Sequence, residues 1–271
     1  MALKTVNENL LSRLAGESAV LVSVVATRGS VPREVGAWMA VFDQDTLGTI
    51  GGGHLELQSI QKARSYLRET VIQDTHLYKL GPSLGQCCGG EVQLHYEIVT
   101  ANELATLEQR LQVETTAVAL FGSGHVGKAL VRVLGSLPVK VNWIDSRDEI
   151  FPDHLPINVR CEHSDPVEAA VDSLEPNSRI LIMSFSHAED LNVVSSCLLR
   201  QRTRADLPFI GLIGSQTKWA TFRSRLIERG FSAQEISHVT CPIGVPGISG
   251  KQPEVIAVAV AAQIMQIRKG N

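Results

Sequence analysis

The second half of the chain alternates apolar segments with segments of helical pattern, and this alternation constrains the fold more than any other feature. Strands are predicted over Ala117–Phe121, Val139–Ile144, Arg179–Met183 and Pro208–Ile213, and helices over Val126–Leu134, Asp190–Leu199 and Lys218–Glu228. Strands and helices that alternate in this way form a parallel sheet covered by helices on both faces. We therefore predict a Rossmann-like, doubly wound α/β domain over residues 114–271.

A glycine-rich turn joins the first of these strands to the first helix. Its motif, Gly122-x-Gly124-x-x-Gly127, has the strand-before, helix-after context of a dinucleotide site, and His125 lies inside it. Asp145 ends the next strand, 18 residues after Gly127, where an acidic residue would bind ribose hydroxyls. The alternative is that the glycines only let helix and strand pack closely.

Four more residues of this half are candidates for ligand contact. Arg147 would hold a phosphate or form a salt bridge. His187 and Asp190 follow the carboxyl end of a predicted strand, where open α/β sheets bind ligands, although Asp190 is equally suited to be a helix N-cap. Cys241 begins a loop rich in glycine and proline, and it is either a thiol of the site or a buried structural cysteine.

The first half, residues 1–113, is predicted to be a separate mixed α/β domain. The boundary is predicted near residues 112–115. The apolar spacing of the first residues predicts an amphipathic helix there. Strands are predicted over Ala19–Ala26, Trp38–Phe42, Val71–Leu80 and Glu91–Val99, and helices over His54–Arg68 and Asn102–Leu111, the second of which connects to the next domain.

Two adjacent cysteines mark the most distinctive turn of this half. Cys87 and Cys88 follow Gln86 between glycines, on backbone that a ligand can approach closely. Neighbouring Cα atoms are about 3.8 Å apart, which disfavours a disulfide between the two. Burial as a small apolar side chain suits Cys197, in an apolar helical stripe, better than this pair. The pair is therefore predicted to bind a soft metal or to take part in sulfur transfer.

A second glycine-rich turn, Gly51-Gly52-Gly53, precedes a predicted helix. Its amides are expected to form an anion-binding nest, with Arg28 and Arg33 as further phosphate ligands. Glu56 lies in the first helical turn, where the helix dipole favours a carboxylate. His54 and Glu56 do not share a helical face, so no zinc site is indicated.

Composition bounds the class of protein. The 271 residues include 25 basic and 28 acidic side chains, and a net charge of −3 gives no general reason to bind nucleic acid or an anionic membrane. Five cysteines in irregular spacing do not make a secreted disulfide framework. The longest strongly apolar run, Val255–Ala262, is far shorter than the roughly 20 residues of a membrane helix. We expect a cytoplasmic protein with no nucleic-acid or membrane partner.

Taken together, the motifs resemble those of the xanthine dehydrogenase accessory family, XdhC/CoxI. The similar segments are Gly29-Ser30-x-Pro32-Arg33-x-x-Gly36-Ala37-x-Met39, Gly48-Thr49-Ile50-Gly51-Gly52-Gly53-x-Leu55-Glu56, Leu84-Gly85-Gln86-Cys87-Cys88-Gly89-Gly90, Phe121-Gly122-x-Gly124-His125-Val126-Gly127, Asp145-x-Arg147, His187-x-x-Asp190, Gly211-Leu212-Ile213-Gly214-Ser215 and Cys241-Pro242-Ile243-Gly244. They follow one another over nearly the whole chain.

The resemblance implies an XdhC/CoxI domain followed by a Rossmann domain. It also implies a chaperone, not an enzyme, that binds molybdenum cofactor (molybdopterin), protects it during sulfuration and inserts it into xanthine dehydrogenase or a related molybdenum hydroxylase. Cys87 and Cys88 would lie near the metal. A cysteine desulfurase and a second copy of the chain are further candidate partners, and NAD(P) or another adenine nucleotide is the candidate for the Rossmann site. Gln216 departs from the family pattern, where arginine is expected.

Two other functions remain open from the sequence. The Rossmann half alone suggests an NAD(P)-dependent oxidoreductase. A sulfurtransferase that carries a persulfide on one cysteine is the third hypothesis.

Overall fold

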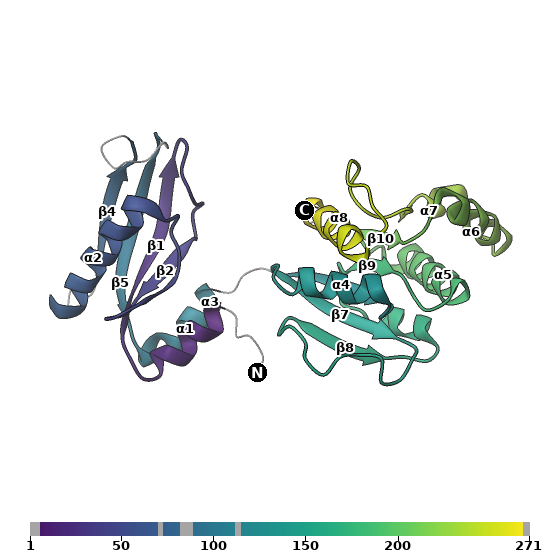
Figure 1. The fold of residues 1–271 in the computed structure, drawn as a ribbon, viewed down its shortest axis with the longest axis horizontal. Helices are drawn as coiled ribbons and strands as arrows, with labels where there is room; N and C mark the ends of the chain where they lie inside the picture. The colour runs from purple at the N-terminus through teal and green to yellow at the C-terminus, as the bar shows by residue number, and fades with distance from the viewer. Residues whose placement is uncertain (1–5, 70–72, 82–88, 112–114, 268–271) are drawn as a thin grey trace. The chain divides into compact units, whose positions relative to one another are not determined.

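The computed structural model describes residues 6–69, 73–81, 89–111 and 115–267. These residues separate into two compact units, one before residue 112 and one after residue 114 (Figure 1).

The N-terminal unit is built on an antiparallel sheet of order β3-β2-β1-β5-β4. Its elements are α1 (Val6–Leu14), β1 (Ala19–Arg28), β2 (Trp38–Val41), β3 (Thr46–Gly48), α2 (Gly53–Glu69), β4 (Gln73–Lys79), β5 (Glu91–Val99), a 3-10 turn (Ala101–Glu103) and α3 (Leu104–Arg110). The predicted opening helix, strands and connecting helix are all present, and β5 has the predicted bounds.

Strand β1 is the central strand of the sheet, and the first part of it is covered on both faces. Val20, Val22 and Val24 pack in the cluster beneath α2, and Ala19 and Leu21 pack in a second cluster with α1 and α3. Figure 1 shows α2 lying along the sheet, and α1 and α3 at the lower end of the sheet in this view. The first four residues of β1, Ala19–Val22, are all apolar and all buried, as this double coverage requires.

The glycine-rich turns of this unit gather at one end of the sheet. Neighbouring strands are antiparallel, so the carboxyl ends of β1, β3 and β4 lie with the amino ends of β2 and β5. Residues 29–37, residues 49–52 and the chain on either side of 82–88 all connect elements there. We call this region the glycine-rich end.

The C-terminal unit is a six-stranded parallel sheet of order β11-β10-β9-β6-β7-β8. Its elements are β6 (Thr116–Phe121), α4 (His125–Leu134), β7 (Val139–Asp145), β8 (Val159–His163), the 3-10 segment η3 (Val167–Ser173), β9 (Arg179–Ile182), α5 (His187–Arg204), β10 (Phe209–Leu212), α6 (Gln216–Glu228), α7 (Ala233–Ile236), β11 (Val239–Thr240) and α8 (Pro253–Gln266). The direction of strand addition reverses between β6 and β9. This is the predicted Rossmann-like, doubly wound arrangement.

Helices cover both faces of this sheet, as predicted. On one face, α4 and α8 bury Leu130, Val260 and Ile264 against β6 and β7. On the other face, η3, α5 and α6 pack over β6, β9 and β10, with Cys197 fully buried. Helix α8 contains the apolar run Val255–Ala262. None of the helices in the described ranges is long and apolar enough to cross a membrane.

Candidate functional site

At the glycine-rich end, the Arg28–Ser30 segment lies directly against Gly90. The Gly90 amide donates to the Ser30 carbonyl oxygen over 3.1 Å. A Cβ atom on Gly90 would lie 2.4 Å from that same oxygen, so only glycine allows this approach. The chain that leads out of the two-cysteine turn therefore passes beside Arg28. Three predicted residues, Gln86, Cys87 and Cys88, lie outside the described residues.

The second arginine of this end lies beside the second glycine-rich turn. Gly51 has φ +124, and a Cβ atom there would lie 2.7 Å from the Pro32 ring and 3.4 Å from Arg33 Cγ. The guanidinium groups of Arg28 and Arg33 are exposed, and neither has a hydrogen-bond or ionic partner among the described residues. The fold thus brings to one end of the sheet two cations without a counter-charge among the described residues, together with Gly81 and Gly89, which flank residues 82–88.

The Gly51–Gly53 turn is already occupied by the chain's own carboxylate. Glu56 Oε2 accepts hydrogen bonds from the amides of Ile50 and Gly52, both at 3.0 Å, and from the Thr49 hydroxyl at 2.5 Å. The Gly51 amide donates to Thr49 Oγ1 over 3.1 Å. This finding corrects the prediction that the amides of Gly51 and Gly52 are free for a phosphate: Glu56, in the first turn of α2, reaches back and fills the nest.

In the C-terminal unit, the three motif glycines have two different roles. Gly122 has φ +113, and a Cβ atom there would lie 2.0 Å from the Met183 carbonyl oxygen; on Gly127 it would lie 2.2 Å from the Gly122 carbonyl oxygen. These two glycines allow close packing. Gly124 is exposed, has no atom within 4 Å of an added Cβ, and is the N-cap of α4 without a side-chain cap. His125, also exposed, begins the helix.

Asp145 is buried at the end of β7, and its carboxylate is fully engaged. Oδ2 accepts from the Ser123 amide at 2.6 Å and from Arg147 Nη2 at 2.9 Å. Oδ1 accepts from the amide and Nε of Arg147, at 3.0 and 2.9 Å. These four bonds use all of the roughly four acceptor sites of a carboxylate, so none is left for a ribose hydroxyl in this arrangement.

The same hydrogen bonds keep the Asp145 carboxylate ionised beside Arg147. Burial alone would raise the pKa of Asp145, but the hydrogen bonds from Arg147 and from the Ser123 amide outweigh it and lower the pKa. Of the two alternatives for Arg147, the structure has the salt bridge, and the guanidinium also lies 4.6 Å from the ring centroid of the exposed Phe185.

Two buried serine hydroxyls lie where the strand order reverses. Ser123 follows β6 and is 1% exposed, and Ser184 follows β9. Neither Oγ atom has a hydrogen-bond partner among the described residues. A Cβ on Gly122 would lie 3.0 Å from Ser184 Cα, so the two segments are in contact. Sequence reasoning missed both serines, although Ser123 lies inside the glycine motif and Ser184 directly follows the predicted strand Arg179–Met183.

A buried ion pair joins three separate segments at the same sheet edge. Lys218 Nζ lies 2.6 Å from Asp190 Oδ2 and donates to the Ile213 carbonyl oxygen over 3.0 Å. Asp190 Oδ1 accepts from the Ser184 amide. Asp190 is therefore not the N-cap of α5; Ser186 is, because its hydroxyl accepts from the Glu189 amide.

The thiol of Cys241 packs beside this ion pair. A Cβ on Gly214 would lie 3.3 Å from Cys241 Sγ and 2.9 Å from Lys218 Cδ. Burial raises the pKa of Cys241 to about 11, although the nearby Lys218 charge lowers it in part. Lys218 was not predicted as a site residue. His187 is exposed, with its ring edge-to-face 6.3 Å from that of Phe222.

Comparisons with known proteins agree with the two-unit organisation. Residues 12–78 match the XdhC and CoxI family, and residues 118–264 match the XdhC Rossmann domain. The uncharacterized protein YqeB of Escherichia coli is 25% identical over 252 residues, which are 92% of this chain but only 43% of that protein. A crystal structure from Bacillus halodurans, described as a xanthine dehydrogenase, shares the fold with a TM-score of 0.78 and 20% identity over 98% of this chain and 96% of that one. The chain therefore belongs to the XdhC and CoxI family.

Proposed function

We propose that this protein is an accessory protein that binds molybdenum cofactor, protects it during sulfuration and delivers it to xanthine dehydrogenase or a related molybdenum hydroxylase. One observation carries the proposal beyond family membership. Arg28 and Arg33 are exposed, have no partner among the described residues, and lie at the same end of one sheet as the chain on either side of residues 82–88.

The residues of the glycine-rich end fit this cofactor in part. Molybdenum cofactor is an anionic, phosphate-bearing pterin that supplies redox chemistry to the enzyme that receives it. Guanidinium groups bind phosphate well, so Arg28 and Arg33 are the proposed phosphate ligands. The Gly51–Gly53 turn does not fit, because Glu56 fills it. Cys87 and Cys88 are the proposed ligands of the metal, since soft thiolates suit such metals.

The other two hypotheses gain less support from the described residues. Burial raises the pKa of Cys161, of Cys197 to about 12, and of Cys241 to about 11. These thiols are protonated at neutral pH, which disfavours them as persulfide carriers because the thiolate is the nucleophile. Asp145 has no acceptor site left for a ribose, which weakens the case for an ordinary NAD-dependent oxidoreductase.

A second binding activity is favoured by the open end of α4. Gly124 is exposed and uncapped at the positive end of the helix dipole, and the Ser123 hydroxyl beside it lacks a partner among the described residues. We propose that this turn binds the phosphate groups of NAD(P) or another adenine nucleotide.

The test of the chaperone proposal is the molybdenum and pterin content of protein purified without oxygen. We expect the Arg28→Ala/Arg33→Ala variant and the Cys87→Ala/Cys88→Ala variant to retain much less cofactor than the wild type. Arg68→Ala, which removes an exposed arginine of the same unit, should retain as much as the wild type. Cofactor absent from the wild type, or equal in all variants, would refute the proposal.

The nucleotide proposal has its own test. Calorimetry with NAD, NADP and ATP should detect binding to the wild type, and Gly124→Val should abolish it, because the added side chain blocks approach to the helix N-terminus. Lys140→Val, at an exposed site on β7, is the control. If no nucleotide binds at millimolar concentration, the motif serves packing alone.

A further inference from the structure

A pocket of about 290 Å³ opens at the edge of the parallel sheet opposite the glycine turn. It lies where β6, β9 and β10 begin, because parallel strands bring their amino ends to one edge. Its wall includes Thr115, Thr116, Glu175, Asn177 and Arg179. The pocket is therefore separate from the Gly124 turn and from the ion pair of Lys218.

Arg179 is the unusual member of this wall. It is the first residue of β9 and only 3% exposed. Its Nη2 donates to the carbonyl oxygen of Ile267, next to the C-terminus of α8, over 2.5 Å. Its Nε is buried without a hydrogen-bond partner, and no carboxylate of the described residues lies within 4 Å of its guanidinium. Burial lowers the pKa of Arg179, and no charge of the described residues offsets this effect.

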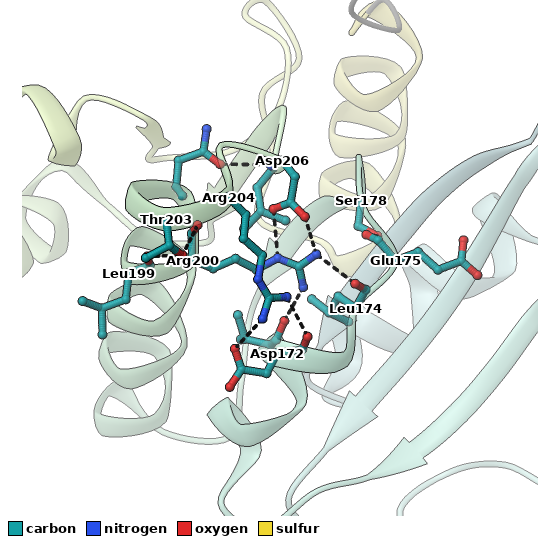
Figure 2. A network of polar contacts seen from close by, with 12 residues as sticks. Asp172, Leu174, Glu175, Ser178, Leu199, Arg200, Thr203, Arg204 and Asp206 are labelled. Atoms are coloured by element: carbon teal, nitrogen blue, oxygen red, sulfur yellow. Dashed lines mark hydrogen bonds and ion pairs between the residues drawn. The ribbon is translucent and has the colours of Figure 1, made fainter.

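The same unit contains a buried arginine with full compensation. Arg200 is 4% exposed. The Asp206 carboxylate accepts hydrogen bonds from Arg200 Nε over 2.9 Å and from Arg200 Nη2 over 2.7 Å. The carbonyl oxygens of Val171 and Leu174 accept from Nη1 and Nη2 (Figure 2). Figure 2 also shows the Glu175 carboxylate pointing away from this network. Arg200 thus has a carboxylate and two carbonyl oxygens as acceptors, whereas Arg179 has one carbonyl oxygen among the described residues for its five N–H donors.

The two buried arginines differ in the free-energy cost of burying their charges. Burying a charge without a partner is strongly unfavourable, even after the surroundings relax. The contact with Ile267 is favourable at a helix C-terminus, but it leaves the charge without a counter-ion among residues 6–267 that the structure describes. Because Arg179 lines an open pocket, an anion that enters from solution can supply what Asp206 supplies to Arg200.

We propose that this pocket binds a small oxyanion, a carboxylate or phosphate group, through the guanidinium of Arg179. The planar guanidinium matches either group with paired N–H donors. The hydroxyls of Thr115 and Thr116 and the amide of Asn177 are the other polar groups of the wall. A volume of about 290 Å³ lies at the small end of ligand pockets, which favours a compact ligand over a dinucleotide. Glu175, exposed in the same wall, opposes anion binding and limits its strength.

The full-length protein can be titrated with sodium phosphate and with sodium acetate at constant pH and ionic strength, balanced with chloride. We expect a saturable rise in melting temperature with at least one of them, since a ligand bound only to the folded state stabilises it. The anion that binds with the higher affinity identifies the group, phosphate or carboxylate, that the pocket prefers. No saturable effect of either anion at tens of millimolar would overturn the proposal.

Three variants assign the effect to this pocket. Arg179→Met keeps the buried volume but removes the charge, and should weaken binding at least about tenfold, because the charge-assisted pair is lost. Arg160→Met removes an exposed arginine of β8 and should leave the affinity unchanged. Glu175→Gln removes the opposing charge and should strengthen binding about twofold or more. Equal affinity in the wild type and Arg179→Met refutes the assignment. If Arg179→Met does not fold, unchanged affinity in Glu175→Gln refutes it.

Discussion

Two glycine-rich turns of this protein precede helices, and they differ in what their amides bind. The turn before α2 folds around the Glu56 carboxylate, which accepts from the amides of Ile50 and Gly52. The turn before α4 keeps Gly124 exposed at an uncapped helix N-terminus. Glycine spacing alone marks both as anion sites, but only the second is open.

The difference comes from one acidic residue within reach of the turn. Glu56 lies in the first turn of α2, whereas the first turn of α4 has no acidic residue. The carboxylate beside the turn before α4 is that of Asp145, which comes from β7 and accepts from the Ser123 amide. A glycine-rich turn is therefore best interpreted together with the first helical turn that follows it.

The largest effect should come from Gly122→Ala. Its Cβ would lie 2.0 Å from the Met183 carbonyl oxygen on backbone with φ +113, so both strands must shift. We expect a loss of more than about 3 kcal/mol in the free energy of unfolding, measured by urea denaturation. Gly124→Ala is the matched control, with open space and a φ of −71, and should cost less than about 1 kcal/mol. Similar losses in both variants would contradict the division of roles between the motif glycines.

Glu56→Ala should have the next largest effect. It leaves two amides and the Thr49 hydroxyl without their acceptor, at a cost of roughly 2 to 3 kcal/mol for hydrogen bonds to a charged group. It should also convert the closed turn into an open one, so that sulfate restores part of the stability in a saturable way. Glu108→Ala, at an exposed site on α3, should change neither quantity. An equal sulfate effect in the wild type and Glu56→Ala would count against an occupied nest.

How much of this could be predicted depends on the range of each interaction. Strands β1 and β5 and the Rossmann alternation are encoded in local apolar patterns, and they were predicted. The three-residue β3 lacks a pattern of its own because only its middle residue is partly buried. Helix α8 was not predicted as a helix, because it is apolar on most sides and shows no clear amphipathic period.

The candidate sites divide in the same way. The contact of Glu56 with its own turn is local, and an acid in the first turn of a helix was a signal for it. The pairing of Lys218 with Asp190 spans 28 residues and depends on how β9 and β10 pair, so no local pattern reveals it. That Arg179 lacks a counter-charge within the described ranges is likewise visible only after folding.

The carboxylate at the open turn predicts a pH dependence. The folded state lowers the pKa of Asp145 below its unfolded value of about 3.9, so its bonds stabilise the protein above that pH. This stability is lost as the pH falls through the folded-state pKa. Asp145→Asn should cost on the order of 2 kcal/mol at neutral pH, because charged hydrogen bonds are lost. The difference between wild type and variant, measured by urea denaturation, should shrink below about pH 4. A difference that is constant with pH would mean that the charge of Asp145 is not what holds the turn.

The smallest effect on stability should come from Arg28→Ala/Arg33→Ala, and this makes the variant informative. Both side chains are exposed and lack partners among the described residues, so their removal should change the free energy of unfolding by less than about 0.5 kcal/mol. Glu56→Ala, in the neighbouring turn, loses stability because its carboxylate has three partners. A residue that contributes nothing to folding but is needed to retain an anionic cofactor acts on the ligand. Urea denaturation of the cofactor-free protein tests the first half of this statement. If the double variant is as unstable as Glu56→Ala, the two arginines hold the glycine-rich end together, and any cofactor loss follows from unfolding.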